Sequence, residues 1–352
     1  MDLVGRRVLV VGLARTGVSV ARFLLERKAR VICTDVKTEE ELGAAAAALR
    51  EAGCRLSLGG HRTELFQDAD LIVVSPGVPL TISPLREVRA AGVEIIGEVE
   101  LAFRHMPRPI VAVTGTNGKT TTVHLIASML EKGGIPHWVG GNIGRPLTEW
   151  LLNPSSDAEG RAPEVVVAEL SSFQLETIVH FRPWVAVWTN LSADHLDRYP
   201  DMEAYAEAKA RIFLNQSAGD FAVVPDREPW LEEKKTRIRA RVLRFGTPAD
   251  PEPDVCLKEK AIVLRREQGG VEERYETGRV RVPGKHNLEN MMAALAAARL
   301  CGADPRGVQE AMDAFVGLEH RVEFVGRGTG FDSSTTPRRR PWIRSCGHWN
   351  AS

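Results

Sequence analysis

The sequence predicts an α/β protein whose mainly parallel sheets are covered by helices, and three observations support this prediction. Between residues 7 and 103, short apolar runs alternate with longer helical stretches, which is the pattern of βαβ units. Residues 104–109, RHMPRP, contain two prolines, and the same alternation restarts directly after them. The length of 352 residues allows two or three domains of ordinary size.

Residues 1–104 are predicted to form a Rossmann-like domain on a parallel sheet. Three apolar runs in this region are predicted as strands: RVLVVGL, RVICTD and DLIVVSPGV. The stretch VARFLLERK and an alanine-rich segment lie between these runs and are predicted as helices. The domain should therefore have the layered architecture in which ligands bind at the carboxyl ends of the strands.

Residues 109–318 are predicted to form a second, central α/β domain. It begins with PIVAVTGTNGKTTT and a helix that continues to about Lys132, and EVVVAEL and VAVWTNL are predicted as strands. Helices are also expected near residues 204–213 and over residues 288–300. The charged, alternating segments TRIRARVLRFG and AIVLRREQGGVEERYETG favour antiparallel strands with one solvated face.

The composition argues against several classes of protein. The 46 Lys and Arg residues balance the 46 Asp and Glu residues, so no overall field favours nucleic acid or an anionic membrane as a partner. No run of about 18 apolar residues and no signal peptide is visible, which predicts a cytoplasmic protein without membrane insertion. Five cysteines without C-x-x-C spacing argue against a disulfide framework and a zinc site. They are Cys33, Cys54, Cys256, Cys301 and Cys346.

The strongest local signal is the segment Gly115-Thr-Asn-Gly-Lys-Thr120, between an apolar run and a helix. A strand, a glycine turn and a helix direct several N–H groups and the helix dipole at one point, where a phosphate can bind. In such a loop Lys119 would contact the terminal phosphates and Thr120 would bind Mg²⁺. The full pattern has another glycine where this chain has Val113, and an ordinary glycine turn is the alternative. The predicted ligand is a nucleoside triphosphate.

A weaker signal is the first turn, Gly12-Leu-Ala14-Arg-Thr-Gly17, followed by Asp35 at the end of the next strand. Glycines permit a tight turn and close approach of a diphosphate, and the carboxylate can hold a ribose or a base edge. Alanine replaces the middle glycine of the dinucleotide pattern, so a NAD site and a turn without ligand are equally favoured. The loop Ser75-Pro-Gly-Val78 leaves a neighbouring strand at the same sheet edge, and together the two loops favour a diphosphate.

Three polar residues follow the phosphate loop along the chain. Glu169 ends the run VVVAEL, His195 lies in DHLDRY, and Lys209 lies in AYAEAKARIF. A carboxylate beside a phosphate loop is a suitable Mg²⁺ ligand, and an imidazole is a less usual one. From spacing alone, a surface carboxylate, a hydrogen-bonded loop histidine and a solvated helix lysine are equally reasonable interpretations.

Several motifs in order give the chain a resemblance to a known family. They are GTNGKTTT, GGNIG, ELSSFQLE, NLSADHLDRY with a lysine fourteen residues after its histidine, GKHNLEN and EHRVEFV. Over about residues 1–326 the chain resembles the Mur ligases of peptidoglycan synthesis. ELSSFQLE, SPGV and GEVELAF are similar to the branch of the family that adds D-glutamate.

The resemblance implies a monomeric, ATP- and Mg²⁺-dependent ligase that forms an amide bond. Its substrates would be UDP-N-acetylmuramoyl-L-alanine and D-glutamate, joined through an acyl phosphate. Lys119, His195 and Lys209 would be catalytic, and Lys209 would be carbamylated by carbon dioxide. Because only a neutral amine attacks carbon dioxide, burial or nearby cations must lower the pKa of Lys209.

The resemblance also implies three sets of site residues. The ATP site would contain Gly115, Thr116, Asn117, Gly118, Lys119, Thr120, Thr121, Asn287 and Arg321. The substrate site would contain Gly12, Ala14, Arg15, Thr16, Gly17, Asp35, Lys37, Ser75, Pro76, Gly77 and Asn142. The metal ligands would be Thr120, Glu169, His195 and Lys209 as its carbamate.

The final residues depart from the family pattern. Members of the family have a third, Rossmann-like domain that begins with a motif close to Asp-Ser-Lys-Ala-Thr-Asn, whereas this chain has FDSSTTPRRRP at residues 331–341. With suitable codons another reading frame of this segment encodes Arg-Phe-Val-Asp-Asp-Ser-Lys-Ala-Thr-Thr. We therefore interpret residues 319–352 as a linker remnant and an out-of-frame tail after a frameshift near Gly326. The third domain would then be missing and ligase activity would be impaired, a hypothesis that resequencing of the coding DNA tests.

Three alternatives remain open at this level. A folylpolyglutamate-type ligase has a similar central domain, but such enzymes do not begin with a UDP-binding domain. A non-catalytic nucleotide-binding remnant fits a chain without the third domain. A NAD-dependent dehydrogenase would bind nicotinamide at the turn that contains Gly12.

Overall fold

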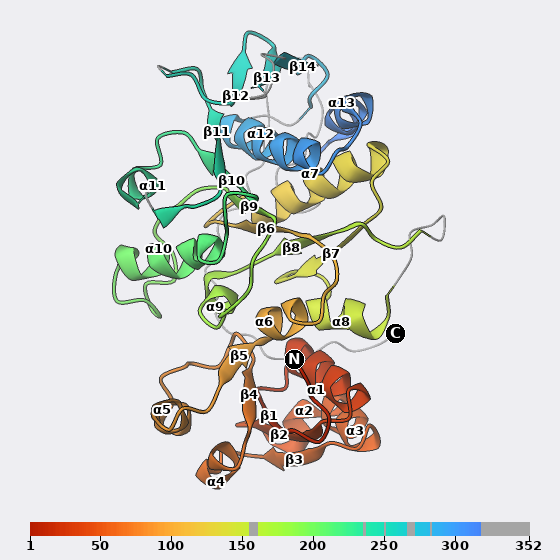
Figure 1. Cartoon of the computed structure of the whole chain (residues 1–352), viewed down its shortest axis with the longest axis vertical. Coiled ribbons are helices and arrows are strands. Elements are labelled where there is room, and N and C mark those ends of the chain that lie inside the picture. The colour runs from red at the N-terminus through yellow and green to blue at the C-terminus, as the bar shows by residue number, and fades with distance from the viewer. Residues whose placement is uncertain (155–160, 235–236, 250, 266–271, 282–283, 318–352) are drawn as a thin grey trace, which may run out of the picture.

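The computed structural model describes residues 1–154, 161–234, 237–249, 251–265, 272–281 and 284–317. Figure 1 shows two sheets along the long axis of the molecule, with helices on their faces and between them. The residues interpreted as a linker remnant and tail, Arg321 included, lie outside the described residues. Among the helices described, none is long and apolar enough to cross a bilayer.

Residues 1–104 are all described and contain a sheet of five parallel strands. The strands are β1 (Arg7–Val11), β2 (Arg30–Asp35), β3 (Arg55–Leu58), β4 (Leu71–Val74) and β5 (Ile95–Gly97), in the order β3-β2-β1-β4-β5. The helices are α1 (Arg15–Glu26), α2 (Glu39–Leu42), α3 (Ala44–Glu51), α4 (Thr63–Gln67), α5 (Ser83–Ala90) and α6 (Glu98–Phe103). The predicted parallel sheet with covering helices is confirmed.

The second sheet has nine strands among the described residues beyond 109. They are β6 (Ile110–Thr114), β7 (His137–Gly141), β8 (Val165–Glu169), β9 (Val185–Trp188), β10 (Phe221–Pro225), β11 (Arg241–Gly246), β12 (Val255–Lys258), β13 (Ala261–Arg265) and β14 (Glu272–Glu276). Their order is β14-β13-β12-β11-β10-β9-β6-β8-β7. The helices are α7 (Lys119–Lys132), α8 (Leu147–Leu152), α9 (Ser172–Leu175), α10 (Met202–Ala210), α11 (Pro229–Lys234), α12 (Lys285–Leu300) and α13 (Pro305–Ala314), with a 3₁₀ turn at Arg211–Phe213.

One strand of this sheet differs from the prediction. β11, in the segment TRIRARVLRFG, pairs in parallel with β10 and with β12, so the predicted antiparallel orientation is wrong. The connection from β10 contains α11 and is long enough for a crossover, which parallel neighbours require. β12, β13 and β14 do pair antiparallel, and only Glu259 and Lys260 separate β12 from β13. A two-residue connection of this kind joins adjacent antiparallel strands.

The central sheet is buried on both faces. Along β6, Val111 and Val113 pack in one apolar cluster with residues of α7, α12 and α13. Ile110 and Ala112, which alternate with them, pack in a second cluster with Trp138 and other residues on the opposite face. Figure 1 shows α7, α12 and α13 on the outer face and α6 and α8 on the face toward the N-terminal domain. Burial on both faces accounts for the nearly continuous apolar runs of these strands.

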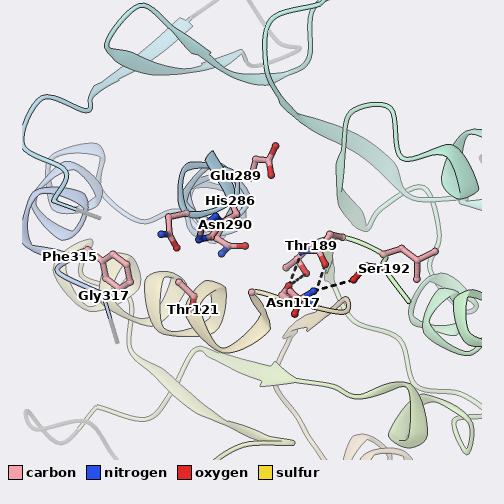
Figure 2. Close-up of a pocket in the computed structure, with 13 residues that line it drawn as sticks. Asn117, Thr121, Thr189, Ser192, His286, Glu289, Asn290, Phe315 and Gly317 are labelled. Carbon is pink, nitrogen blue, oxygen red and sulfur yellow. Dashed lines mark hydrogen bonds between the residues drawn. The ribbon is translucent and has the colours of Figure 1, made fainter. Parts of the chain in front are cut away.

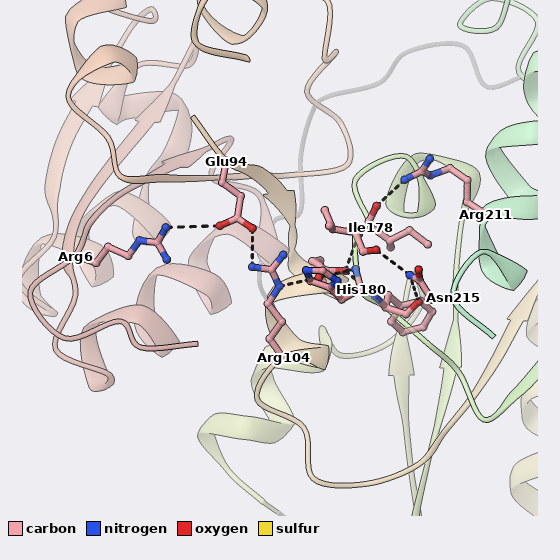
Figure 3. A network of polar contacts seen from close by, with 10 residues as sticks. Arg6, Glu94, Arg104, Ile178, His180, Arg211 and Asn215 are labelled. Atoms are coloured by element: carbon pink, nitrogen blue, oxygen red, sulfur yellow. Dashed lines mark hydrogen bonds and ion pairs between the residues drawn. The ribbon is translucent and has the colours of Figure 1, made fainter. Parts of the chain in front are cut away.

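Helix α6 joins the two domains through the buried carboxylate of Glu100. This carboxylate accepts hydrogen bonds of 2.8–3.0 Å from the backbone N–H groups of Val179, His180 and Phe181. It also accepts a hydrogen bond of 2.7 Å from the Arg104 side chain. Burial alone would raise the pKa of Glu100, but these hydrogen bonds outweigh it and lower the pKa. Figure 3 shows Arg104 extending this network to Glu94 of the N-terminal domain. The network fixes the loop after α9 against the first domain.

Glu98, two residues earlier, is bound differently. Its Oε1 accepts the backbone N–H of Thr148 at 2.6 Å, but its buried Oε2 has no hydrogen-bond partner. Burial therefore raises the pKa of Glu98 to about 7. A further bond of 2.8 Å joins the hydroxyls of Ser19 in α1 and Thr148 in α8. The two domains thus meet through these polar contacts and through Leu151 and Leu152 of α8, which pack against the apolar cluster of the first domain.

Candidate active site

The segment Gly115–Gly118 connects β6 to α7 and depends on its two glycines. Gly115 has φ +143°, and a Cβ there would lie 2.0 Å from the Thr189 hydroxyl. Gly118 has φ +79°, and a Cβ there would lie 2.3 Å from the Asn290 side-chain oxygen. Both positions combine a backbone conformation that favours glycine with a close neighbour. A residue with a side chain at either position would therefore disturb the loop.

Residues that directly follow β9 support this loop. The backbone N–H groups of Thr116 and Asn117 donate to the main-chain and side-chain oxygens of Asn190, both at 2.9 Å. The Thr189 hydroxyl donates to the Asn117 carbonyl at 2.7 Å, and the Asn117 amide donates to the Ser192 hydroxyl at 3.2 Å (Figure 2). These residues were not predicted from the sequence, although their position after a strand that pairs with β6 is the signal that identifies them.

Two lysines converge on the carbonyl oxygen of Gly115. Lys119 Nζ donates to it at 2.9 Å and to the Thr116 carbonyl at 2.8 Å, and Lys209 Nζ donates to it at 2.7 Å. Lys209 is only 1% exposed. Burial, and then the positive charge of Lys119, lower the pKa of Lys209 to about 7. The side chain thus has the environment that a neutral amine requires.

Glu169 and Asn142 lie at the same sheet edge. Glu169 is the last residue of β8 and pairs in register with Val113 of β6. Asn142 donates its side-chain amide to Glu169 Oε1 at 3.1 Å and its backbone N–H to the Glu169 carbonyl at 2.8 Å. Glu169 is 2% exposed, and its Oε2 has no hydrogen-bond partner. One buried carboxylate oxygen is therefore left for a ligand.

His195 belongs to an aromatic group that also contacts Lys209. Its ring centroid lies 5.0 Å from that of Phe173 and 6.0 Å from that of Tyr205. Lys209 Nζ lies 4.5 Å from the centroid of Tyr205, whose hydroxyl is 3.4 Å from Thr116 Oγ1. The structure thus brings His195, Lys209 and the phosphate loop together around Tyr205.

Glu169 is the residue here that best fits a magnesium ion, because one of its carboxylate oxygens is buried without a partner. Among the described residues, no group of three or more His, Cys, Asp and Glu side chains is placed to hold a metal. Mg²⁺ is usually bound by one or two carboxylates together with phosphate oxygens and waters. The buried Glu169 Oε2 without a partner is the kind of oxygen that such an ion needs. Thr120 lies in the first turn of α7, at the start of the same site.

A cavity of about 560 Å³ opens beside the phosphate loop (Figure 2). This volume lies in the range of small-ligand sites. Of the residues predicted for the ATP site, four line it: Asn117, Gly118, Thr121 and Asn287. Residues not predicted also line it: Thr189, Asn190, Leu191, Ser192, His286, Glu289, Asn290, Phe315 and Gly317. The cavity extends from the phosphate loop to the start of α12.

The first glycine turn, between β1 and α1, is stabilised by contacts within its own domain. Gly12 has φ +88°, and a Cβ on Gly17 would lie 1.9 Å from the Gly12 carbonyl oxygen. That oxygen accepts the Ser75 hydroxyl at 2.7 Å, which joins the two loops predicted for the substrate. Asp35 accepts the backbone N–H of Leu13 at 2.6 Å and of Lys37 at 2.9 Å. The carboxylate therefore holds the turn in shape.

The other residues predicted for the substrate lie around this turn. Ala14 is the N-cap of α1 and makes no side-chain cap bond, while Arg15 and Thr16 form the first turn of the helix. Arg15 also approaches Glu149 of the central domain at 3.5 Å. Gly77 has open space where a side chain would be, and the Pro76 carbonyl accepts a bond from Arg198 at 3.3 Å. Arg198 was not predicted from the sequence.

Two family profiles match the chain. The profile described as "Mur ligase middle domain" matches residues 113–298. The profile described as "Mur ligase MurD-like, N-terminal domain" matches residues 6–97. These ranges contain both glycine turns.

Two similar curated proteins carry the name UDP-N-acetylmuramoylalanine--D-glutamate ligase. The protein from Geotalea daltonii is 45% identical over 325 residues, which cover 92% of this chain and 70% of that protein. The protein from Pelobacter propionicus is 47% identical over 326 residues, which cover 92% of this chain and 71% of that protein.

A solved structure supports the fold. The UDP-N-acetylmuramate:L-alanyl-gamma-D-glutamyl-meso-diaminopimelate ligase from Neisseria meningitides aligns with a TM-score of 0.60 at 22% identity. The alignment covers 90% of this chain and 99% of that one. At this identity the likeness concerns the fold alone, and the predicted α/β class is confirmed.

Proposed function

The chain belongs to the Mur ligase family, as its motifs predicted, and we propose that it adds D-glutamate to UDP-N-acetylmuramoyl-L-alanine with ATP. The observation that carries this proposal is a convergence at one sheet edge. Glu169 at the end of β8 pairs with Val113 of β6, Lys209 donates to the glycine loop after β6, and a cavity of about 560 Å³ opens beside this loop. The identity to the two D-glutamate ligases supports the choice of substrate.

The proposed reaction needs no protein nucleophile. The substrate carboxylate attacks the γ-phosphorus of ATP and displaces ADP, which gives an acyl phosphate. The neutral amine of D-glutamate then attacks the acyl carbon, and the amide forms as phosphate leaves and the nitrogen loses a proton. The N-terminus of α7, which has no side-chain cap bond, and the Lys119 ammonium would hold the phosphates and neutralise the charge on the transferring group. These groups stabilise the transition state because they are in position before the reaction.

We assign the metal-binding role to Glu169, His195 and Thr120, with Lys209 as its carbamate. A Mg²⁺ ion would supply neutralisation of phosphate charge at this site. The buried Glu169 oxygen without a partner supports the first assignment. The lowered pKa of Lys209 supports the last, because the neutral amine is the form that reacts with carbon dioxide.

We assign the UDP portion of the substrate to the first domain. The start of α1 has no side-chain cap, and the uncapped N-terminus of a helix attracts phosphate. Gly12, Gly17 and the Ser75–Gly77 loop lie at the same edge, where open α/β sheets bind their ligands. Asn142, bonded to Glu169, would contact the substrate near the reacting carboxylate.

Release of phosphate tests the proposal. The chain and the Geotalea daltonii protein are assayed with ATP, Mg²⁺, UDP-N-acetylmuramoyl-L-alanine and D-glutamate, each omitted in turn. We expect phosphate release by the Geotalea daltonii protein to require all four. This chain should show the same requirement at a reduced rate, because residues 319–352 are interpreted as replacing the third domain, and the release should disappear in Lys119→Met. Release that requires a folate in place of the UDP compound would overturn the proposal. Binding of both nucleotides without phosphate release would instead favour a non-catalytic nucleotide-binding protein.

A further inference from the structure

Arg198 crosses from the central domain to the loop that we assign to the UDP compound. It lies three residues after His195, and its Nη1 donates to the Pro76 carbonyl of the N-terminal domain at 3.3 Å. We infer that Arg198 is a positioning residue that fixes the Ser75–Gly77 loop relative to His195, and so couples binding of the UDP compound to binding of the nucleotide. This inference rests on the proposed function, because it assumes that the two ligands occupy the two domains.

Three contacts hold the Arg198 guanidinium in one orientation. Besides Pro76, it contacts Glu176 Oε2 through Nη2 at 3.3 Å. Its Cζ lies 4.1 Å from the ring centroid of Phe173. A planar guanidinium can stack on an aromatic ring while it donates in two directions, which a lysine ammonium cannot do. The geometry is thus specific for arginine.

Tyr199 holds the other end of the Glu176 carboxylate. Its hydroxyl donates to Glu176 Oε1 at 2.5 Å. Burial, and then this bond, raise the pKa of Tyr199, so the hydroxyl remains a donor at neutral pH. With both carboxylate oxygens bonded, Glu176 is a fixed partner for Arg198.

The same group holds His195. The ring of Phe173 contacts both residues: it is in contact with the Arg198 guanidinium, and its centroid lies 5.0 Å from that of the His195 ring. His195 has φ +53°, a conformation that is strained for a residue other than glycine. Its carbonyl accepts the backbone N–H groups of Arg198 and Tyr199, both at 3.0 Å. A shift of Arg198 therefore reaches His195 through the ring of Phe173 and through this turn.

On the other side, Pro76 connects Arg198 to the first glycine turn. The neighbouring Ser75 donates its hydroxyl to the Gly12 carbonyl at 2.7 Å. A continuous set of contacts thus joins Gly12, Ser75 and Pro76 to Arg198, Phe173 and His195. The buried contacts of α6 already fix the two domains relative to each other. The contacts from Gly12 to His195 therefore affect the positions of the loops that contain these residues, and not the positions of the domains.

The test is a binding experiment with the chain and the variants Arg198→Met and Arg198→Lys. Calorimetry measures the Kd of UDP-N-acetylmuramoyl-L-alanine and of a non-hydrolysable ATP analogue with Mg²⁺, each alone and with the other present at saturation. We expect about tenfold weaker binding of the UDP compound in Arg198→Met and a smaller loss in Arg198→Lys. The analogue alone should bind within about twofold of the unmodified chain, while the coupling between the ligands falls at least about threefold.

Arg244→Met is the matched control, because Arg244 is also part-buried and paired, with Asp226 at 3.1 Å, but lies in β11. It should leave both affinities unchanged. A lower melting temperature of Arg198→Met with unchanged Kd values and coupling would reduce Arg198 to a structural role and overturn the inference alone. Absence of any binding of the UDP compound to the unmodified chain would overturn the proposed function together with the inference. If Arg198→Met does not fold, the same comparison is made with Arg198→Lys.

Discussion

Each sheet of this molecule has a glycine turn between an inner strand and a helix, but the two turns are held by different groups. The turn at Gly12–Gly17 contains no lysine, and Asp35 and Ser75 of its own domain stabilise it. The turn at Gly115–Thr120 is stabilised by residues that follow β9, and the side-chain nitrogens of Lys119 and Lys209 donate to one of its carbonyls. The cationic side chain of the first turn, Arg15, approaches Glu149 of the other domain at 3.5 Å, whereas Lys119 of the second turn donates to two carbonyls of its own loop.

The difference corresponds to what each turn must do. A diphosphate that is only held in place needs backbone donors and a helix N-terminus. A phosphoryl group that is transferred gathers charge on its oxygens, and neutralisation of that charge provides most of the catalysis. The first turn, whose Arg15 pairs with Glu149, therefore suits the part of the substrate that does not react, and the second turn, with Lys119 bonded within the loop, suits ATP. Variants that affect one turn and not the other test this division.

The largest effects are expected from alanine at the two crowded glycines. Gly17→Ala would place a Cβ 1.9 Å from the Gly12 carbonyl oxygen, and Gly115→Ala would place one 2.0 Å from the Thr189 hydroxyl. We expect Gly17→Ala to weaken binding of the UDP compound at least about 100-fold and to spare the ATP analogue. Gly115→Ala should weaken binding of the ATP analogue to a similar extent and leave binding of the UDP compound unchanged. Calorimetry with each ligand alone measures both effects.

Gly278→Ala controls for the substitution itself, because a Cβ there meets nothing within 4 Å. Its affinities for both ligands should equal those of the unmodified chain. Equal weakening of both ligands by Gly17→Ala would show that the two turns do not act separately.

Removal of the lysine of the second turn should have the next largest effect. Lys119→Met deletes the ammonium that lies 2.9 Å from the Gly115 carbonyl and 2.8 Å from the Thr116 carbonyl. We expect the ATP analogue to bind 10- to 100-fold less tightly, or about 2 kcal/mol, because a charged contact to phosphate is lost. The UDP compound should bind as before. An unchanged Kd for the analogue would mean that Lys119 does not reach the phosphates.

Lys209→Met should stabilise the fold while it removes the proposed carbamate. The variant eliminates a buried amine, and the Gly115 carbonyl keeps its bond from Lys119. We expect a gain of about 2 kcal/mol in the free energy of unfolding at pH 7. Urea unfolding in buffer without carbon dioxide measures this gain.

The gain should depend on pH in a defined direction. The pKa of Lys209 is lowered from 10.5 to about 7, so between these values the unfolded chain binds a proton that the folded chain does not. The stability of the unmodified chain therefore rises with pH across this window, and the advantage of Lys209→Met shrinks. Below pH 7 the difference should be constant. An advantage that grows from pH 7 to pH 10 would contradict the lowered pKa.

The sequence predicted the elements that depend on the types of residues adjacent to one another along the chain. The strand before Gly115, the turn and the helix after it follow from residue types alone, and so does the need for a buried Lys209 once its chemistry is assumed. Thr189, Asn190 and Ser192 were not predicted, because their role depends on β9 lying next to β6 in the sheet. The strand order results from packing on both faces and has no local signal.

The same limit explains the incorrect orientation of β11 and the missed roles of Glu100 and Arg198. Alternation of polar and apolar residues indicates a half-buried strand, but the direction of its partner depends on the connection between them. Glu100 and Arg198 each act across the two domains. Nothing in the spacing of a single charged residue indicates a partner in another domain.

The smallest effect is expected at Asp35, the residue that holds the first turn from within its own domain. Its two carboxylate oxygens accept the N–H groups of Leu13 and Lys37. Asp35→Asn has one acceptor oxygen, so one of these amides loses its partner at a cost of about 1 kcal/mol in the free energy of unfolding. Urea unfolding should show this loss, and the UDP compound should bind less tightly while the ATP analogue is unaffected. If Asp35→Asn weakened the ATP analogue as well, the first turn would influence the second directly, and the division between a holding turn and a reacting turn would be wrong.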